Sequence, residues 1–189
     1  MDSAKQPGGS HPQWNVLCCA PGSCPPDPES IDERANDESN MLNPGRVTIR
    51  RLSPDMVVKY GSFVTVTEAQ SMIYVAERTQ SIPVPKVFAN CTHGPLDRDL
   101  DDYGSLFDTY IFMSLVDGQT LDLAWDSYDE LTKIRISNQL RTYMDEVREI
   151  KNEPYIGSVN KGPVIDQIFD NFHIKGFPAL ALTPYKTKI

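Results

Sequence analysis

Alternating apolar and polar positions predict a pair of short antiparallel strands in the first third of the chain. Apolar residues alternate with polar ones from 46 to 52, and a second apolar run at 56–58 ends at Lys59. The segment Ser-Pro-Asp at 53–55 separates the two runs, and these residue types are typical of turns. The pattern therefore predicts a β-hairpin whose second strand carries Lys59 at its end.

A helix is predicted directly after this hairpin. Thr65 and Glu68 have the three-residue spacing of a capping box, and the following apolar residues recur at helical spacing. Those expected to face a core are Ala69, Met72, Ile73 and Ala76. Pro83 and Pro85 exclude further helix and predict an extended linker that leads into a strand at Val87–Phe88.

Two more elements follow from the pattern downstream. The apolar run 110–115 predicts a buried strand, and Asp117-Gly118 then predicts a turn. Ser127 and Glu130 have a second capping-box spacing, which predicts a long helix over 128–151. Its apolar stripe, expected to form core, consists of Leu131, Ile134, Leu140, Tyr143, Met144, Val147 and Ile150.

Composition suggests that the first 44 residues differ from the rest. The chain has 189 residues, of which 40% are hydrophobic, enough for one domain or a small domain with a tail. Residues 1–44 are rich in Pro, Gly, Ser, Asp and Asn, with one apolar group around Trp14 and Val16–Leu17. We expect this segment to be a disordered, acidic tail. A short docking motif around Trp14 is the alternative.

Charge and hydropathy exclude some partners. The net charge is −8, and residues 1–44, with seven acidic and two basic side chains, carry −5 of it, leaving −3 for the remainder. Clustered cations are needed to bind nucleic acid, so we expect no nucleic-acid partner. No apolar stretch of about 18 residues predicts a membrane span. The N-terminus lacks an apolar signal region, so we expect a cytoplasmic protein.

The cysteines do not form a zinc-binding pattern. Four are present, at Cys18, Cys19, Cys24 and Cys91. None belongs to a CxxC pair, and His11 is the only histidine near the first three, whereas structural zinc sites use four ligands at tight paired spacing. Exposed thiols in the N-terminal segment are therefore the favoured interpretation.

An acidic loop between two predicted strands partly matches a calcium-binding template. Asp97, Asp99, Asp101 and Asp108 fall at positions 1, 3, 5 and 12 of an EF-hand loop. Gly104, however, lies at position 8 instead of the required position 6, and the flanking segments are predicted strands, not helices. We therefore expect a solvated hairpin loop.

Three segments together resemble a known superfamily. They are VVKYG followed by TEAQSMIYVAERTQSIPVPKVFA, then YIFMSLVDGQTLDLAW, and finally KIRISNQLRTYMDEVREI with YIGSV. In order and spacing they resemble the aminoglycoside phosphotransferase and choline kinase-like superfamily of protein-kinase-like enzymes, particularly its fungal members. The similarity covers about residues 46–159.

The resemblance implies an α+β fold with a kinase-like N-terminal lobe, an antiparallel sheet plus one helix, then a hinge and the first helix of a helical C-terminal lobe. The implied division is 1–44 tail, 45–116 N-lobe and hinge, 117–160 start of the C-lobe and 161–189 divergent tail. It also implies ATP as ligand. Lys59 takes the place of the phosphate-contacting lysine and Glu68 that of its helix partner. Met113, Ser114 and Leu115 take the place of the hinge that binds adenine.

Local reasoning alone leaves simpler roles open for these residues. A lysine at the end of a strand is commonly just solvated, and Glu68 already has a local role as a capping glutamate. Kinases also place a glycine-rich loop over the phosphates, whereas only Gly45 is available here. Either a looser phosphate loop or the loss of the first strand would account for this.

The catalytic motifs implied by the family are missing from this sequence. An HxDxxxxN-type loop and a second magnesium-binding Asp are expected after the long helix. His173 has no aspartate two residues after it, and the spacing of Asp166, Asp170 and Asn171 matches neither motif. We therefore expect a chain truncated before the catalytic loop, with no magnesium held, no phosphotransfer and at most weak ATP binding. The alternative is a non-catalytic module that binds a protein partner, or itself, through the apolar face of the 128–151 helix.

Overall fold

The structure, a computed structural model, describes residues 11–22, 24–34, 41–42, 47–151 and 157–162. These residues fall into two compact units. The first draws on residues 1–69 and 85–116, and the second on residues 70–84 and 117–189. The fold is α+β, as predicted.

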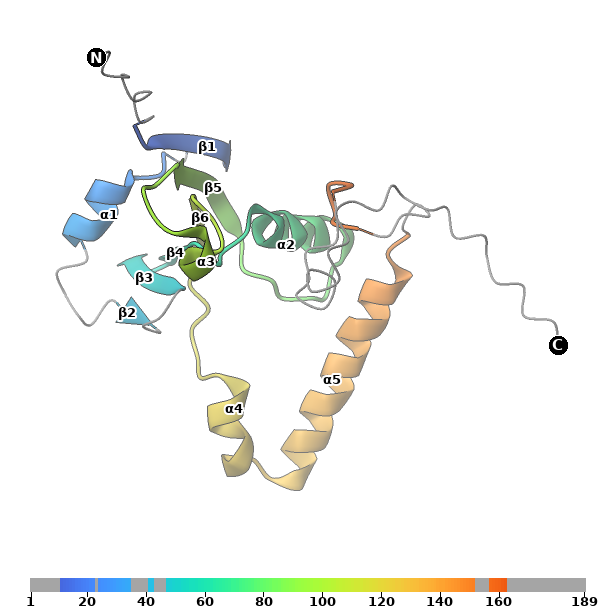
Figure 1. Cartoon of the computed structure of the whole chain (residues 1–189). Helices are drawn as coiled ribbons and strands as arrows, with labels where there is room; N and C mark the ends of the chain where they lie inside the picture. Colours follow the sequence, from blue (N-terminus) through green and yellow to red (C-terminus); the bar gives the residue numbers. More distant parts are fainter. Residues whose placement is uncertain (1–10, 23, 35–40, 43–46, 152–156, 163–189) are drawn as a thin grey trace, which may run out of the picture. The chain divides into compact units, whose positions relative to one another are not determined.

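A six-stranded antiparallel sheet forms the first unit (Figure 1). Its order is β1-β5-β6-β4-β3-β2, and every neighbouring pair is antiparallel. The strands are β1 Gln13–Cys19, β2 Met41–Leu42, β3 Thr48–Ser53, β4 Met56–Gly61, β5 Val87–Gly94 and β6 Asp108–Ser114. The predicted hairpin is confirmed as β3 and β4, and the predicted strands near 87 and 110 are confirmed as β5 and β6.

One face of the sheet holds a core to which the N-terminal segment contributes. Helix α1 (Pro28–Arg34) supplies Ile31, which is fully buried against a cluster that includes Val58 of β4 and Phe112 of β6. Trp14 of β1 packs edge-on against Tyr110, with 5.0 Å between ring centroids. Apolar side chains from three separate segments therefore share one core.

The predicted disorder of residues 1–44 is wrong for residues 11–22 and 24–34, which include β1 and α1. The remaining residues of that segment, apart from β2, lie outside the described part. The prediction failed because Trp14 and Ile31 are too sparse to form a core of their own. They gain burial by joining a sheet built from residues 48–114, a long-range contact that local composition does not reveal.

Helix α2 (Val66–Arg78) follows β4 as predicted. Thr65 caps it, because the Glu68 backbone N–H donates to Thr65 Oγ1 at 3.2 Å. Ala69 is fully buried. Ala76, which was expected to face a core, is exposed because it lies in the last turn of the helix. The predicted apolar stripe is therefore shorter than expected.

The connection from β5 to β6 forms a hairpin, as expected, and contains the short helix α3 (Leu100–Tyr103). One carboxylate in this connection and one at the start of β6 bind groups of the same chain. Asp99 accepts from the Asp101 N–H at 2.9 Å, and Asp108 pairs with Arg98 at 2.8 Å. Within the described residues, no group of three or more Asp, Glu, His or Cys side chains is arranged to hold a metal ion.

The second unit contains three further helical elements: α4 (Leu121–Ala124), a 3₁₀ turn η2 (Trp125–Ser127) and α5 (Glu130–Glu149). The long helix is confirmed, but its predicted cap is wrong. Asp129 is the N-cap and accepts from the Thr132 N–H at 2.7 Å. Ser127 instead donates its hydroxyl to the Ala124 carbonyl at 2.6 Å, because it ends the preceding turn.

The apolar stripe of α5 does not form the predicted core. No residue of the helix is buried, and Leu131 is 67% exposed. The described elements of the second unit are few, so they leave most of this stripe uncovered. None of the described helices combines the length and apolar character that crossing a bilayer requires.

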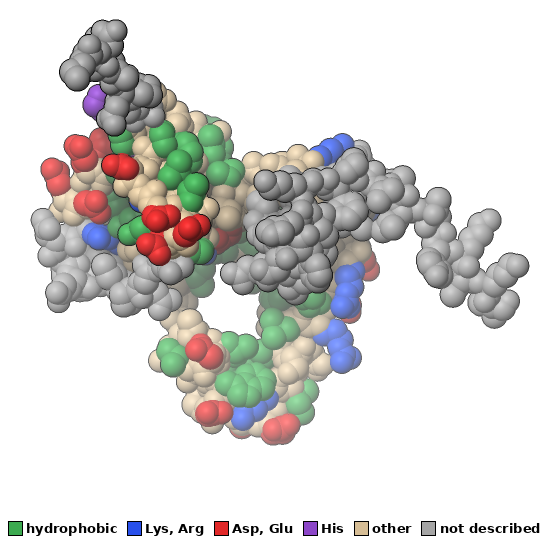
Figure 2. All heavy atoms as spheres, in the orientation of Figure 1, with side chains coloured by type: hydrophobic (Ala, Val, Ile, Leu, Met, Phe, Trp, Pro, Cys, Tyr) green, Lys and Arg blue, Asp and Glu red, His purple; other side chains and the backbone are tan. Residues whose placement is uncertain are grey.

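Acidic side chains gather over α1 and α3 in the first unit (Figure 2). Helix α1 contributes Glu29, Asp32 and Glu33, and the region of α3 contributes Asp99, Asp101 and Asp102. Such a surface repels anions.

Candidate functional site

Lys59 lies at the centre of the sheet's second face. In β4 it pairs with Ile49 of β3 and Ile111 of β6. Side chains alternate along a strand, so Lys59 points away from the face that carries Val58 and the core cluster. Flanking strands on both sides hold its backbone in place, and its side chain is 23% exposed. The sheet therefore holds the Lys59 ammonium group in a defined position.

Glu68 approaches this ammonium from the first turn of α2. Lys59 Nζ donates a hydrogen bond to Glu68 Oε1, so the structure brings the two predicted residues together. Thr65 fixes the start of the helix and thereby the direction in which the Glu68 side chain leaves it. Lys59 and Glu68 are only nine positions apart in the sequence, which makes this contact a local one.

The pair positions Lys59 more than it stabilises the fold. The Glu68 side chain is 35% exposed, so water and salt screen the attraction. Ion pairs of this exposure contribute about 1 kcal/mol or less to folding. Lysine side chains lose rotamer freedom when held, and here Glu68 has already restricted the ammonium before any ligand arrives.

A buried amide lies in the same cross-strand row. Asn90 of β5 pairs with Ile111, which pairs in turn with Lys59, so all three side chains share one face. Asn90 is 1% exposed, and its Oδ1 has no hydrogen-bond partner within the described residues. It lies two strands from Lys59, or about 10 Å away. Sequence reasoning missed it, although a lone amide inside the apolar run 87–91 was a visible signal.

The backbone of the predicted hinge, residues 113–115, is already hydrogen-bonded to neighbouring segments. Ser114 donates its N–H to the Lys86 carbonyl at 2.9 Å and accepts from the Lys86 N–H through its hydroxyl at 2.9 Å. Leu115 donates its N–H to the Asp55 carbonyl at 2.9 Å. Met113 pairs with strands on both sides. These bonds fix the segment, but they also occupy two of the N–H groups that an adenine ring would use.

Other residues considered from the sequence lie outside the described residues. They are Gly45, Asp166, Asp170, Asn171 and His173. The structure therefore describes the residues predicted to contact phosphate and to form the hinge, but not the region predicted for the catalytic loop.

Comparison of the chain with protein-family models, curated proteins and solved structures gives no match. The resemblance to the aminoglycoside phosphotransferase superfamily thus depends on the residues quoted for it. The geometry at Lys59 stands independently of that resemblance.

Proposed function

We propose that the first unit is a kinase-like nucleotide-binding lobe of the aminoglycoside phosphotransferase type. Lys59 would contact the phosphates of ATP, with Glu68 as its helix partner and the segment from Met113 to Leu115 beside the adenine. The observation that carries the proposal is the contact between Lys59 Nζ and Glu68 Oε1. Protein kinases use a strand lysine in the same way, paired with a helix glutamate.

The order of elements supports the same function. The lysine strand β4 leads into the glutamate helix α2, then into two further antiparallel strands and out through residues 113–116. This is the order that the resemblance implies for an N-terminal lobe and hinge. In the proposed lobe the ligand approaches the face of the sheet that carries Lys59.

We propose weak binding and no phosphotransfer. The N–H groups of Ser114 and Leu115 are already bonded within the unit, which removes donors that would fix adenine. One lysine supplies the positive charge, and the sequence offers no magnesium-binding motif at the family's spacing. We expect a Kd for ATP on the order of 1 mM, since few polar contacts converge on the ligand.

Calorimetric titration with ATP in the presence of a chelator tests the binding. Lys59→Gln should lower affinity at least fivefold, equivalent to about 1 kcal/mol. Glu68→Gln should have a smaller effect because Lys59 keeps its charge but loses its partner. Lys86→Gln is the matched control, because it removes an exposed lysine of the same unit and leaves backbone bonds intact. Equal affinities in the Lys59 and Lys86 variants would refute the assignment.

A coupled assay with magnesium, ATP and a panel of small alcohols and amines tests the second half of the proposal. We expect no turnover above the rate of buffer alone. Magnesium-dependent phosphorylation of any acceptor, lost in Lys59→Gln, would show that the chain is a phosphotransferase after all.

The exposure of α5 favours a second candidate, a non-catalytic interaction module. Large apolar side chains along this helix are between 39% and 67% exposed: Leu131, Ile134, Leu140, Met144 and Val147. Exposed apolar surface of this kind is typical of interfaces. Sedimentation velocity over a wide concentration range should then show self-association that Leu131→Lys with Met144→Lys abolishes. A monomer at every concentration would exclude self-association through this face.

A further inference from the structure

A cavity of about 480 Å³ lies within the second unit. The last two turns of α2, the end of α5 and the turn at 157–162 surround it. Its apolar walls are Val75, Val147, Ile150 and Val159. Ligand pockets have volumes of about 300–1,000 Å³ and walls of this kind, so the cavity has the size of a small-molecule site.

Basic side chains line the same cavity. Arg78, Lys151 and Lys161 all contribute to its wall, and no acidic residue is among the described residues that line it. This local excess of positive charge contrasts with the chain's net charge of −8. A cavity lined by cations attracts anions, and its apolar walls strengthen that attraction by excluding water.

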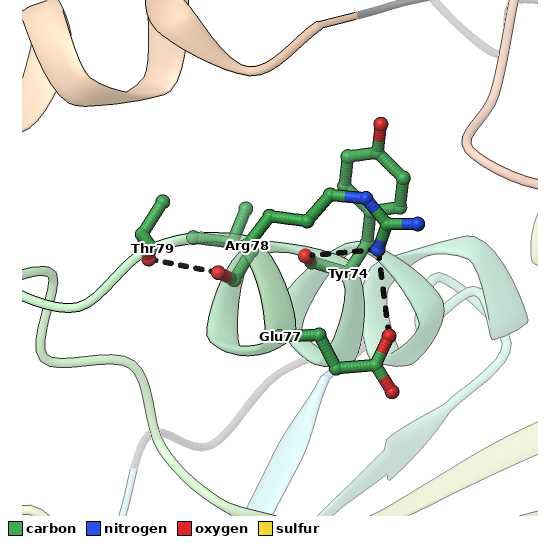
Figure 3. Close-up of polar contacts among 5 residues, drawn as sticks. Tyr74, Glu77, Arg78 and Thr79 are labelled. Carbon is green, nitrogen blue, oxygen red and sulfur yellow. Dashed lines mark hydrogen bonds and ion pairs between the residues drawn. The ribbon is translucent and has the colours of Figure 1, made fainter.

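Arg78 is held in place before any ligand binds (Figure 3). Its guanidinium carbon lies 3.7 Å from the centroid of the Tyr74 ring. Nη1 donates to the Tyr74 carbonyl at 3.5 Å and lies 3.4 Å from Glu77 Oε2. Within the described residues both polar contacts use Nη1, which leaves Nε and Nη2 as donors for an anion. A stacked guanidinium suits carboxylate and phosphate groups because its donors form a planar fork.

We propose that this cavity binds a small organic anion, a carboxylate or phosphate group attached to a flat apolar body. Arg78 and Lys151, which both line the cavity, bind the charged group. The apolar walls around Ile150 cover the body of the ligand. Inorganic phosphate alone would leave those walls in contact with water, and an uncharged aromatic molecule would form no ion pair with Arg78 or Lys151.

Three probes separate the two parts of the ligand. 1-Naphthyl phosphate has both the anion and the flat body, 1-naphthol has only the body, and inorganic phosphate has only the anion. We expect calorimetry to give a Kd of about 0.1–1 mM for 1-naphthyl phosphate and at least tenfold weaker binding for each part. Comparing the affinity for 1-naphthyl phosphate with that for 1-naphthoate shows whether the site favours a phosphate or a carboxylate group.

A pair of charge-matched variants assigns the binding to the cavity. Arg78→Gln should weaken 1-naphthyl phosphate at least tenfold, which corresponds to about 1.4 kcal/mol. Arg141→Gln removes the same charge from an exposed position on α5 that does not line the cavity, and should leave the affinity unchanged. Circular dichroism checks that both variants fold, and Lys151→Gln replaces Arg78→Gln if the latter does not.

Four results would overturn the proposal. They are no binding of 1-naphthyl phosphate at ten times the expected Kd, equal losses in the Arg78 and Arg141 variants, equal affinity for inorganic phosphate, and equal affinity for 1-naphthol. Lys59→Gln should not change this binding, and Arg78→Gln should not change the effect of Lys59→Gln on ATP affinity. The cavity and the proposed nucleotide site can therefore fail independently.

Discussion

Replacing Ile31 with alanine tests whether the N-terminal segment belongs to the core of the sheet unit. Ile31 is fully buried beside Val58 and Phe112. Helix α1 has only seven residues, too few to be stable in isolation. The folding of α1 therefore depends on the packing of Ile31 in the core. That packing would be absent if the segment were a disordered tail.

A packed α1 and a disordered tail predict very different losses of stability when Ile31 is truncated. Truncating a fully buried isoleucine to alanine costs 2–5 kcal/mol, so we expect the free energy of unfolding to fall by about 3 kcal/mol. For a unit of about 100 residues this lowers Tm by roughly 12–24 °C. Ile31→Val removes one methyl group and should cost about 1 kcal/mol. In a disordered tail, both changes would have almost no effect.

Urea unfolding followed by far-ultraviolet circular dichroism measures these losses at an unchanged slope. Leu17→Ala is the matched control, because Leu17 lies in the same segment but is 51% exposed and should lose less than about 0.5 kcal/mol. A loss below about 0.5 kcal/mol for Ile31→Ala, or one equal to that of Leu17→Ala, would show that α1 does not pack in the core.

Two further predictions concern ionisable groups. Hydrogen bonds from the Ser81 side chain and then the Gln80 backbone lower the pKa of Glu146 from its usual 4.5. The wild-type chain should thus be more stable than Glu146→Gln above about pH 4.5, and this difference should disappear as acid protonates the carboxylate. Urea unfolding of both chains at several pH values measures the difference in the free energy of unfolding. A difference that grows in acid would contradict this prediction. Burial, and then the nearby Cys18 and Cys19, raise the pKa of Cys91 to about 12. Iodoacetamide at about pH 8 should therefore modify the three exposed cysteines of the native chain and spare Cys91, as mass spectrometry can show, whereas urea-unfolded chain should react at all four.

Local sequence patterns were sufficient for the strand and helix that carry the candidate site. Turn residues fixed the β3–β4 hairpin, and the Thr65 cap fixed the start of α2. Because so few residues separate Lys59 from Glu68, two local elements were enough to bring them together. The second cap failed because two acceptors, Ser127 and Asp129, lay close to the helix start, and the turn at η2 used the serine.

Long-range contacts decided the rest of the candidate site. The burial of Asn90 depends on β5 lying between β1 and β6, and pairing partners are not encoded in the strand's own pattern. The same holds for Ser114 and Leu115, whose N–H groups bond to carbonyls 28 and 60 positions earlier in the chain, at Lys86 and Asp55. The cavity beside Arg78 likewise needs α2 and α5 side by side within one unit.

By itself, then, the sequence determined where the central strands and the two main helices lie, and it singled out Lys59 and Glu68. Periodicity, turn residues and caps act over a few residues, which is why they were readable without a structure. Only the tertiary structure decided that β1 and α1 join the sheet and that the stripe of α5 stays exposed. Both depend on which apolar surfaces meet across long stretches of chain, and the free energy gained there belongs to the assembled fold and not to any single segment.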